Sequence, residues 1–234
     1  MKLITQYLII LTCSTICLNT YAQKHKKPKN LPRYDHQKIH FGFTLGVNAL
    51  NFNIKKNNNT LNNDSLLTLY TQDQKGFNLG IVSNLRLGKY TDLRFIPALV
   101  FGERLLKYNF RNSDDSKTKR IESTLIDFPI YIKYKSERYN NFRTYIISGI
   151  KYSLDIASQD KIDDNGEEIV KLKKNDLMGE IGFGIDFYLE YFKFSTQIKL
   201  SHGILNLLAQ DQSVYTQSIN KLTTSGWIFS VTFE

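Results

Sequence analysis

The fold is decided by the stretch IHFGFTLGVN, residues 39–48, in which apolar side chains alternate with small or polar ones without interruption. The apolar residues, such as Ile39 and Phe41, stand at odd-numbered positions, whereas His40 and Gly42 stand at even-numbered ones. We call each of these two alternating sets of positions a parity. Successive side chains of a β-strand point to opposite faces. The stretch therefore predicts a strand with one apolar face and one small or polar face.

The same two-residue period returns in further segments along the chain. They cover residues 76–88, 92–102, 125–134, 142–156, 180–190, 192–201 and 227–234. Each is near the ~9–11 residues that a tilted membrane-spanning strand requires, and an even number of strands is typical of bacterial outer-membrane barrels. Beyond residues 1–22 the sequence contains no uncharged apolar run of about 18 residues, so it predicts no membrane-spanning helix.

The connections between these segments alternate in length. Long polar stretches at about 53–75, 104–120, 158–175 and 206–225 alternate with short connections. A meander with long loops at one rim and tight turns at the other is typical of outer-membrane barrels, which keep both termini in the periplasm. The sequence therefore predicts an all-β fold, a transmembrane antiparallel up-and-down barrel of about eight strands, within residues 39–234.

Alternation alone leaves open whether the apolar face meets lipid or lines a soluble, lipocalin-like barrel. The other parity is rich in glycine and charge, which suits the crowded interior of a small membrane barrel. Ionised groups removed from water must pair, so we predict an interior charge network formed by Arg86, Arg94, Asp127, Lys133, Arg143, Lys151, Asp155, Glu180 and Asp186. Alternatively, these residues form a conduit or a gate and exchange their charge partners when it opens.

Aromatic residues near the strand ends match the girdles that membrane barrels place at the two lipid–water interfaces. We expect an interfacial position for Phe52, Tyr134, Phe142, Phe187, Phe192, Trp227 and Phe233. The outer face between the girdles would contact outer-membrane lipids.

Residues 1–22 have the layout of a secretory signal peptide, with cleavage expected between Ala22 and Gln23. Both cysteines, Cys13 and Cys17, lie in this segment. The mature chain is therefore expected to have no thiol for a disulfide or a metal site. Neither cysteine has the small preceding residue at the end of the apolar core that lipid attachment would need, so a lipoprotein is the less favoured interpretation.

Residues 23–38 form a basic stretch with prolines and no apolar period, so we expect an extended, mobile periplasmic linker. Docking of this segment to a periplasmic partner or to acidic headgroups is the alternative. The formal charge of +9 is scattered over strand-like segments. In an exported chain this pattern excludes nucleic acid as a partner and fits attraction to anionic lipid.

No residue pattern predicts catalysis, a cofactor or a metal. His36 and His40 are four apart, but the alternation places His40 on a strand and not on a helix. Ser201 and His202 are neighbours on a strand, so they point to opposite faces and cannot form a nucleophile–base pair. The acidic cluster within residues 160–168 lacks the ligand spacing of an EF-hand, so an exposed turn is favoured over a calcium site.

Several segments carry a resemblance to known families. LIDFPIYIKY, residues 125–134, resembles a signature of outer-membrane β-barrels widespread in Bacteroidetes, and residues 182–187 and 201–206 resemble the sixth and seventh strands of the same barrels. NLPRYD, residues 30–35, leading into residues 39–48, resembles the PorT proteins. This resemblance implies a part in the type IX secretion system and supplies no catalytic residue.

These observations favour a non-enzymatic outer-membrane barrel that assists assembly or operation of type IX protein secretion. Its expected partners are outer-membrane lipids and secretion-system proteins, the latter through the rim loops and residues 23–38. A free-standing small barrel for adhesion or envelope stability is the alternative, and a lipid-modifying enzyme is a third hypothesis.

Overall fold

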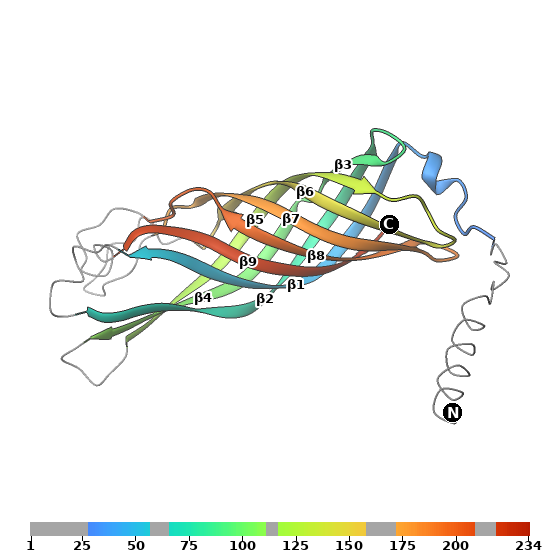
Figure 1. The fold of residues 1–234 in the computed structure, drawn as a ribbon. Helices are drawn as coiled ribbons and strands as arrows, with labels where there is room; N and C mark the ends of the chain where they lie inside the picture. The colour runs from blue at the N-terminus through green and yellow to red at the C-terminus, as the bar shows by residue number, and fades with distance from the viewer. Residues whose placement is uncertain (1–27, 57–65, 111–116, 158–171, 209–218) are drawn as a thin grey trace, which may run out of the picture.

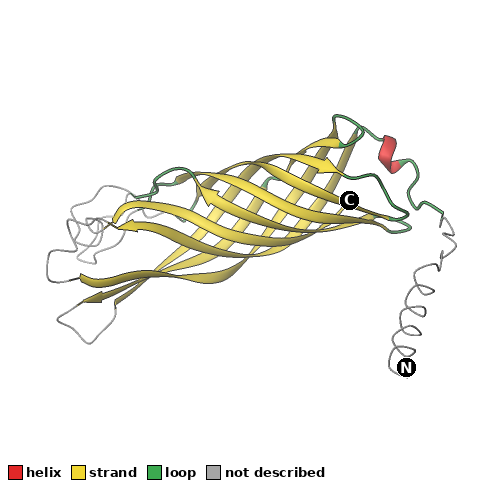
Figure 2. Ribbon diagram, in the orientation of Figure 1, coloured by secondary structure: helices red, strands yellow, loops and turns green. Residues whose placement is uncertain are grey.

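The computed structural model describes residues 28–56, 66–110, 117–157, 172–208 and 219–234, which form one elongated β-barrel (Figures 1 and 2). A short 3-10 turn precedes the strands within these ranges. The elements are η1 (Tyr34–His36), β1 (Ile39–Lys56), β2 (Leu66–Arg86), β3 (Thr91–Phe95), β4 (Ala98–Phe110), β5 (Lys117–Lys135), β6 (Phe142–Asp155), β7 (Asn175–Tyr188), β8 (Lys193–Gly203) and β9 (Ile219–Phe233).

The strands close into a ring because β1 pairs with both β2 and β9. All neighbouring strands are antiparallel, and β3 and β4 share one place in the ring between β2 and β5. The ring therefore has eight places. The predicted all-β, antiparallel up-and-down barrel is confirmed. In the described residues, no helix is long and apolar enough to cross a membrane.

The break between β3 and β4 lies at Ile96 and Pro97. Proline has no N–H group and cannot donate to a neighbouring strand. The Pro97 carbonyl still accepts a hydrogen bond from the Ile81 N–H of β2 at 3.0 Å. The ring therefore stays closed across the break.

The two ends of the barrel differ. We call one the turn end, where η1 and Glu234 lie and where the strands are joined by short connections at 87–90, 136–141 and 189–192 (Figure 1). We call the other the loop end, where the strands lead into residues outside the described ranges, at 57–65, 111–116, 158–171 and 209–218.

Several strands run further toward the loop end than the sequence predicted. β1 continues to Lys56, β2 starts at Leu66 and β9 starts at Ile219. On β1 the outward side chains of this part, such as Asn53 and Lys55, are polar, so no apolar alternation marks these strand residues. The prediction was therefore wrong for parts of three expected connections, at 53–75, 104–120 and 206–225.

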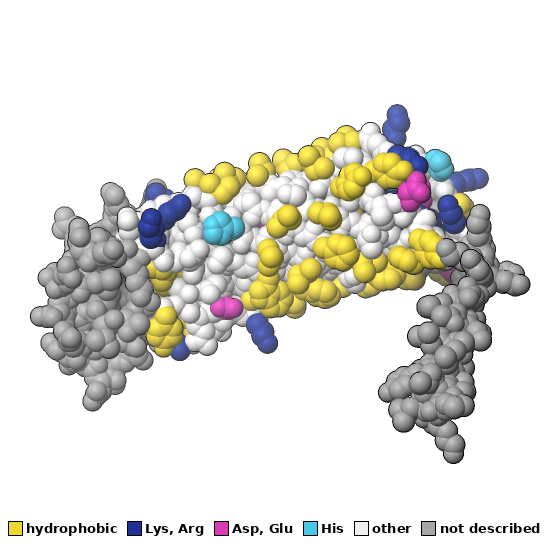
Figure 3. Space-filling view, viewed as in Figure 1, with side chains coloured by type: hydrophobic (Ala, Val, Ile, Leu, Met, Phe, Trp, Pro, Cys, Tyr) yellow, Lys and Arg dark blue, Asp and Glu magenta, His cyan; other side chains and the backbone are white. Residues whose placement is uncertain are grey.

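The outer face of the barrel is apolar between its two ends, as Figure 3 shows for one side. Phe41 is 68% exposed, whereas the intervening His40 is buried. We call this band the apolar belt, which comprises Ile39, Phe41, Phe43, Leu45, Val47, Phe77, Leu79, Ile81, Leu99, Phe128, Ile130, Ile132, Ile146, Ile150, Ile181, Phe183, Ile198, Leu200 and Phe229. So large an exposed apolar surface requires an apolar solvent or a partner.

Ile130→Arg places a charge on β5 within the apolar belt. We expect the free energy of unfolding in a lipid bilayer to fall by about 2–4 kcal/mol, as for an arginine at the middle of a membrane. Asn53→Arg, beyond the belt on β1, is the matched control and should cost about 0–1 kcal/mol. Urea titration followed by fluorescence measures both values. Equal losses would contradict the position assigned to the belt.

Candidate functional site

Charged side chains fill the interior and meet in groups. Lys133 donates hydrogen bonds to both carboxylate oxygens of Asp186, at 2.8 and 2.9 Å, and Ser195 donates to the same carboxylate at 2.6 Å. The Lys133 ammonium also lies 3.6 Å from the centre of the Tyr145 ring. Because all four side chains are buried, these contacts replace the water that the two charges lose.

A second group lies nearer the loop end, around Glu180. Lys151 lies 2.7 Å from Glu180 and 3.2 Å from Asp127, and Lys199 lies 3.3 Å from the other Glu180 oxygen. The Tyr131 hydroxyl donates to Glu180 as well. Two cations thus face two carboxylates, so this buried group is neutral overall.

A third group lies at the turn end. Arg94 pairs with Glu234, and the Lys193 ammonium reaches the other Glu234 oxygen at 2.5 Å. Beside them, Lys135 pairs with Asp92 at 2.6 Å. The carboxylate of Glu234 therefore joins strand β9 to the interior of the ring.

Arg104 is an interior cation that the sequence analysis missed. Its guanidinium lies 3.8 Å from a carboxylate oxygen of Asp155, donates to the Ser123 hydroxyl at 2.5 Å and packs 4.4 Å from the centre of the Phe52 ring. Arg104 falls in a stretch predicted as a connection, where no alternation marks the inward face. Its only sequence signal is the parity it shares with buried Val100 on the same strand.

Eight of the nine residues predicted for the interior network are buried, and Arg86 is half-buried at the turn end, where it donates to the Asp35 carbonyl. The predicted set contains the partners of Lys133 and Lys151. It lacks the partners of three others, whose pairs are Arg94–Glu234, Arg143–Asp35 and Asp155–Arg104. The interior is therefore neutralised partly by residues outside the regular alternation.

Apolar side chains occupy the space between the charged groups. A central cluster contains Val82, Ile96, Tyr131, Tyr145 and Ile147. A cluster toward the loop end contains Phe52, Leu106, Leu172, Leu207, Leu208, Ile219 and Leu222. The interior cavities beside Tyr131 and Tyr34 measure about 20 and 10 Å³, each with room for about one water. Neither cavity has room for a solute larger than water.

Gly184 allows the Tyr145 ring to lie across the interior. A Cβ atom at position 184 would lie 2.3 Å from Cζ of Tyr145, which is far too close. The ring instead packs against the glycine backbone, and its hydroxyl donates to Gln197 at 3.0 Å. This glycine therefore helps to close the interior.

The amino-terminal segment, residues 28–38, docks on the turn end instead of extending away from it. Tyr34 inserts its ring 3.9 Å from the His40 ring in a stacked arrangement, and its hydroxyl donates to Glu234 at 2.8 Å. Lys193 lies 4.7 Å from the centre of the same ring. The expectation of an extended linker is therefore wrong for residues 28–38, because Tyr34 packs against His40 and Lys193 and bonds to Glu234.

Asp35 provides the ionic part of this docking. Its carboxylate lies 2.8 Å from the Arg143 guanidinium and 3.4 Å from that of Arg138, and it accepts a hydrogen bond from the Tyr188 hydroxyl at 3.2 Å. Arg138 also packs 3.7 Å from the centre of the Tyr188 ring and donates to the Asn30 carbonyl. We call residues 28–38 the docked segment. The turn-end residues that it contacts form the socket: His40, Arg86, Arg138, Asn141, Arg143, Tyr188, Lys193 and Glu234.

The ionisation of the docked segment follows from these contacts. Burial raises the pKa of Asp35, but the Arg143 and Arg138 guanidinium groups outweigh it and hold this pKa below its ordinary value. Burial and the Glu234 carboxylate raise the pKa of Tyr34 well above its ordinary value. Asp35 is therefore an anion and Tyr34 a neutral donor near neutral pH.

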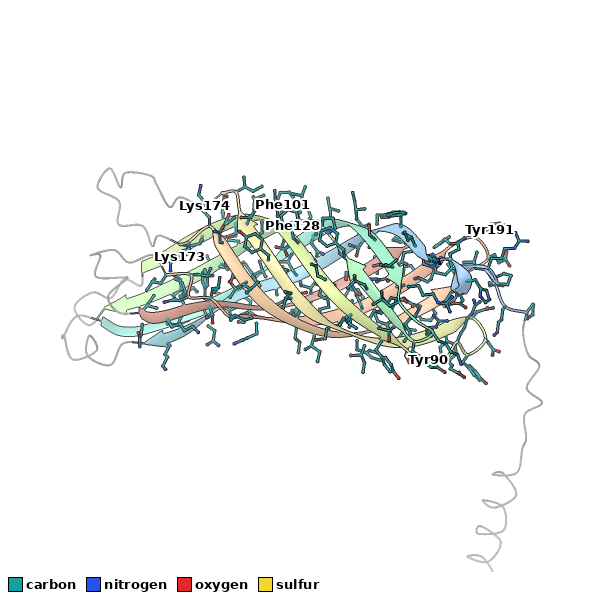
Figure 4. The ribbon with its side chains drawn as sticks, turned by 90° about the horizontal axis from the view of Figure 1, so that it is seen from above. Tyr90, Phe101, Phe128, Lys173, Lys174 and Tyr191 are labelled. Carbon is teal, nitrogen blue, oxygen red and sulfur yellow. The ribbon has the colours of Figure 1, made fainter. Side chains whose placement is uncertain are left out.

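Most of the predicted interfacial aromatics lie outside the barrel at the turn end. Tyr134, Phe142, Phe187, Phe192 and Phe233 occupy strand ends or turns there, and Phe192 and Phe233 lie 6.0 Å apart. Tyr90 and Tyr191 lie at the same end and were missed (Figure 4). Trp227 is opposite Ala49 and Leu200, further from this end.

Phe52 was assigned to the outer aromatics wrongly. It is 3% exposed and packs inside the loop end against Leu106 and Leu222. Phe52 shares the parity of Thr44 and Asn48, which point inward, so the alternation itself excludes an outer position.

The residues of the other candidate sites do not come together in the structure. Ser201 points inward and donates to Glu180 at 2.6 Å, whereas His202 is exposed on the outer face. His40 is buried against Tyr34, and His36 is exposed. Among the described residues, no three His, Cys, Asp or Glu side chains are arranged to hold a metal. The predicted cleavage site and the acidic cluster at 160–168 lie outside the described residues.

A family profile described as outer membrane protein beta-barrel domain matches residues 21–209. The chain belongs to this family. It is an outer-membrane β-barrel protein, and its apolar belt contacts membrane lipids. Among curated proteins, none matches the sequence.

Solved barrels are similar in structure and remote in sequence. The outer membrane protein OprG of Pseudomonas aeruginosa is 12% identical with a TM-score of 0.47, and 83% of this chain and 92% of that chain are covered. Neisserial surface protein A is 10% identical with a TM-score of 0.44, over 84% and 98% of the two chains. The amino-terminal barrel domain of OprF of Pseudomonas aeruginosa is 13% identical with a TM-score of 0.32, over 81% and 97%.

Asp35→Asn removes the negative charge that faces Arg138 and Arg143. Since Asp35 is partly exposed, we expect a loss of about 1–2 kcal/mol of docking free energy, or roughly 5- to 30-fold faster opening of the docked segment. Amide hydrogen exchange of residues 30–37 in the full chain measures this opening. Gln37→Ala, at an exposed neighbour, is the matched control. Unchanged exchange in Asp35→Asn would contradict an ionic anchor.

Docking should also depend on pH. The docked pKa of Asp35 lies below the undocked value of about 3.9. The docked state therefore binds fewer protons, so its stabilisation is complete above about pH 4 and is lost as pH falls through the docked pKa. Hydrogen exchange of the segment between pH 6 and pH 2.5, corrected for intrinsic rates, should show this loss in the wild type and a flat profile in Asp35→Asn. Parallel profiles would contradict it.

Proposed function

We propose that this outer-membrane barrel acts without catalysis, by binding other proteins at its two ends. The filled interior carries this proposal, because charged groups and apolar clusters occupy it from Glu234 at the turn end to Leu222 at the loop end. A barrel filled in this way offers its partners surfaces and not a conduit.

The proposed partners are components of the type IX secretion system. The resemblance to PorT proteins supports this assignment, and it rests on residues 30–35 and 39–48. Within the first of these ranges, Asn30, Tyr34 and Asp35 make the contacts that dock the segment in the socket. Three of the residues that carry the resemblance thus hold the docked segment at the turn end.

We place the turn end in the periplasm and the loop end outside the cell. Short turns and both termini on the periplasmic side are the usual arrangement of such barrels, which supports this orientation. In it, the docked segment and the preceding basic residues from position 23 face periplasmic partners, and cleavage after Ala22 would release them from the signal peptide.

Deletion of the gene tests the secretion role. We expect the extracellular level of type IX cargo to fall and unprocessed cargo to accumulate in the cell. Complementation with the wild type or with Gln37→Ala should restore export, and Asp35→Asn should restore it less well at equal protein levels. Cargo export that is unchanged by the deletion would overturn the assignment.

A free-standing surface role is the second candidate. The extension of β1, β2, β4, β5 and β9 beyond the apolar belt favours it, since it lengthens the wall of the barrel at the loop end and exposes polar side chains such as Asn53 and Lys55 of β1. Affinity purification in mild detergent separates the two candidates. Co-purified secretion components support the first, and a barrel recovered alone together with normal cargo export supports the second.

A further inference from the structure

A row of small and polar side chains interrupts the apolar outer face near the loop end. Gly179 of β7, His202 of β8 and Ser225 of β9 are partners in register and form one outward row. Below this row lie the exposed belt residues Ile181 and Leu200. On β8 and β9 this row is where small and polar side chains first interrupt the apolar outer face, and beyond it Ile204 and Leu205 are exposed again.

A depression lies along this row on the outer wall. It measures about 580 Å³, and its lining includes Ser148, Gly179, Leu200, His202 and Ser225. A Cβ atom added at Gly179 would meet nothing within 4 Å, so the hollow is open where the side chain is missing. The outer wall thus offers space beside the apolar belt near the loop end.

Cations gather on the loop-end side of the depression. Lys55, Lys173, Lys174 and Lys221 are all exposed there. Figure 3 shows basic side chains beside a histidine near this end, and Figure 4 shows Lys173 and Lys174 at the same end. We call these four lysines the lysine cluster.

Backbone and side-chain contacts hold the lysine cluster in place. The Lys173 N–H donates to the Leu207 carbonyl at 2.9 Å, and the Lys174 carbonyl accepts from the Asp155 N–H at 2.8 Å. The Lys221 ammonium reaches back to the Ile204 carbonyl at 3.4 Å, two residues beyond His202.

The lysine cluster has an excess of positive charge. Lys55 and Lys221 are direct partners in the β1–β9 register, and like charges in such a position repel. On the described part of β6–β9 at this end, Asp155, Asp176 and Glu180 all point inward and are buried. Within the described ranges the outer surface of β6–β9 therefore carries no carboxylate, and the exposed carboxylate of Asp73 on β2 accepts a hydrogen bond from Asn51 of β1 at 2.7 Å.

We propose that the depression and the lysine cluster form a binding site for a phosphate-bearing membrane lipid. The headgroup phosphate lies among the lysines and His202, and an acyl chain lies over Leu200 and Ile181. Charge complementarity identifies this occupant, because an anion relieves the repulsion of Lys55 and Lys221 at the level where lipid headgroups begin. The site is separate from the secretion role and does not depend on it.

Lipid binding to the full-length mature protein in mild detergent tests the proposal. The probe is diphosphoryl lipid A, and the control ligand is the same glycolipid after removal of both phosphates. Native mass spectrometry should show adducts of the phosphorylated form at least about 10-fold tighter than those of the control. Equal affinity for the two glycolipids would overturn the proposal.

Two pairs of substitutions locate the site. Lys55→Gln with Lys221→Gln, and separately Lys173→Gln with Lys174→Gln, should each weaken binding by about 10- to 30-fold. Lys75→Gln with Lys107→Gln removes the same charge on β2 and β4 and should leave binding within about 2-fold. Gly179→Leu should fill the hollow and weaken binding without a change of charge.

Each variant is checked for folding by its heat-dependent shift in gel mobility. Folded test variants that bind lipid A as tightly as the wild type would overturn the site, and so would a loss in Lys75→Gln with Lys107→Gln of the same size. Should Lys55→Gln with Lys221→Gln fail to fold, Lys173→Gln with Lys174→Gln alone decides the outcome.

Discussion

The closed hydrogen-bonded ring in an apolar solvent is the constraint on which the rest of the structure depends. Hydrocarbon supplies no partner for a backbone N–H or C=O group, so the first and last strands must pair, as Phe43 and Phe233 do in β1 and β9. Closure assigns one parity of each strand to lipid and the other to a narrow interior. Charges of the inner parity then need partners within the barrel, which explains why Lys133 meets Asp186 and Lys151 meets Glu180.

Because side chains fill the interior, the surfaces of the barrel are the parts that can bind partners. At the turn end, Tyr34 donates to Glu234 and Asp35 pairs with two arginines of the socket, so a segment outside the ring becomes part of the surface. At the loop end, β1, β2, β4, β5 and β9 extend beyond the belt, and the lysine cluster lies on β1, on β9 and just before β7. The same barrel therefore presents chemically different faces to its two surroundings.

The alternation of side chains predicted the ring, the apolar outer face and the burial of most interior charges, because each depends only on the period of a strand. The prediction failed for strand residues that show no alternation of apolar and polar side chains. Beyond the belt both faces of a strand can be polar, so Arg104 and the ends of β1, β2 and β9 were missed. The docking of Tyr34 depends on Glu234 and Lys193, about 200 and 160 residues away along the chain. A local sequence pattern carries no information on such contacts. Phe52 was assigned to the outer face because it is aromatic, although its position in the alternation places it inside.

Spin labels placed singly along β8, from Phe194 to His202, test the central claim most directly. In lipid bilayers, collisions with oxygen, which concentrates in the membrane interior, report which side chains face lipid. The account predicts a strict period of two, with high accessibility at Ile198 and Leu200 and low accessibility at Gln197 and Lys199, and a fall at His202, where the belt ends. A flat profile, or a period with Gln197 and Lys199 facing lipid, would contradict a ring with a polar, sealed interior.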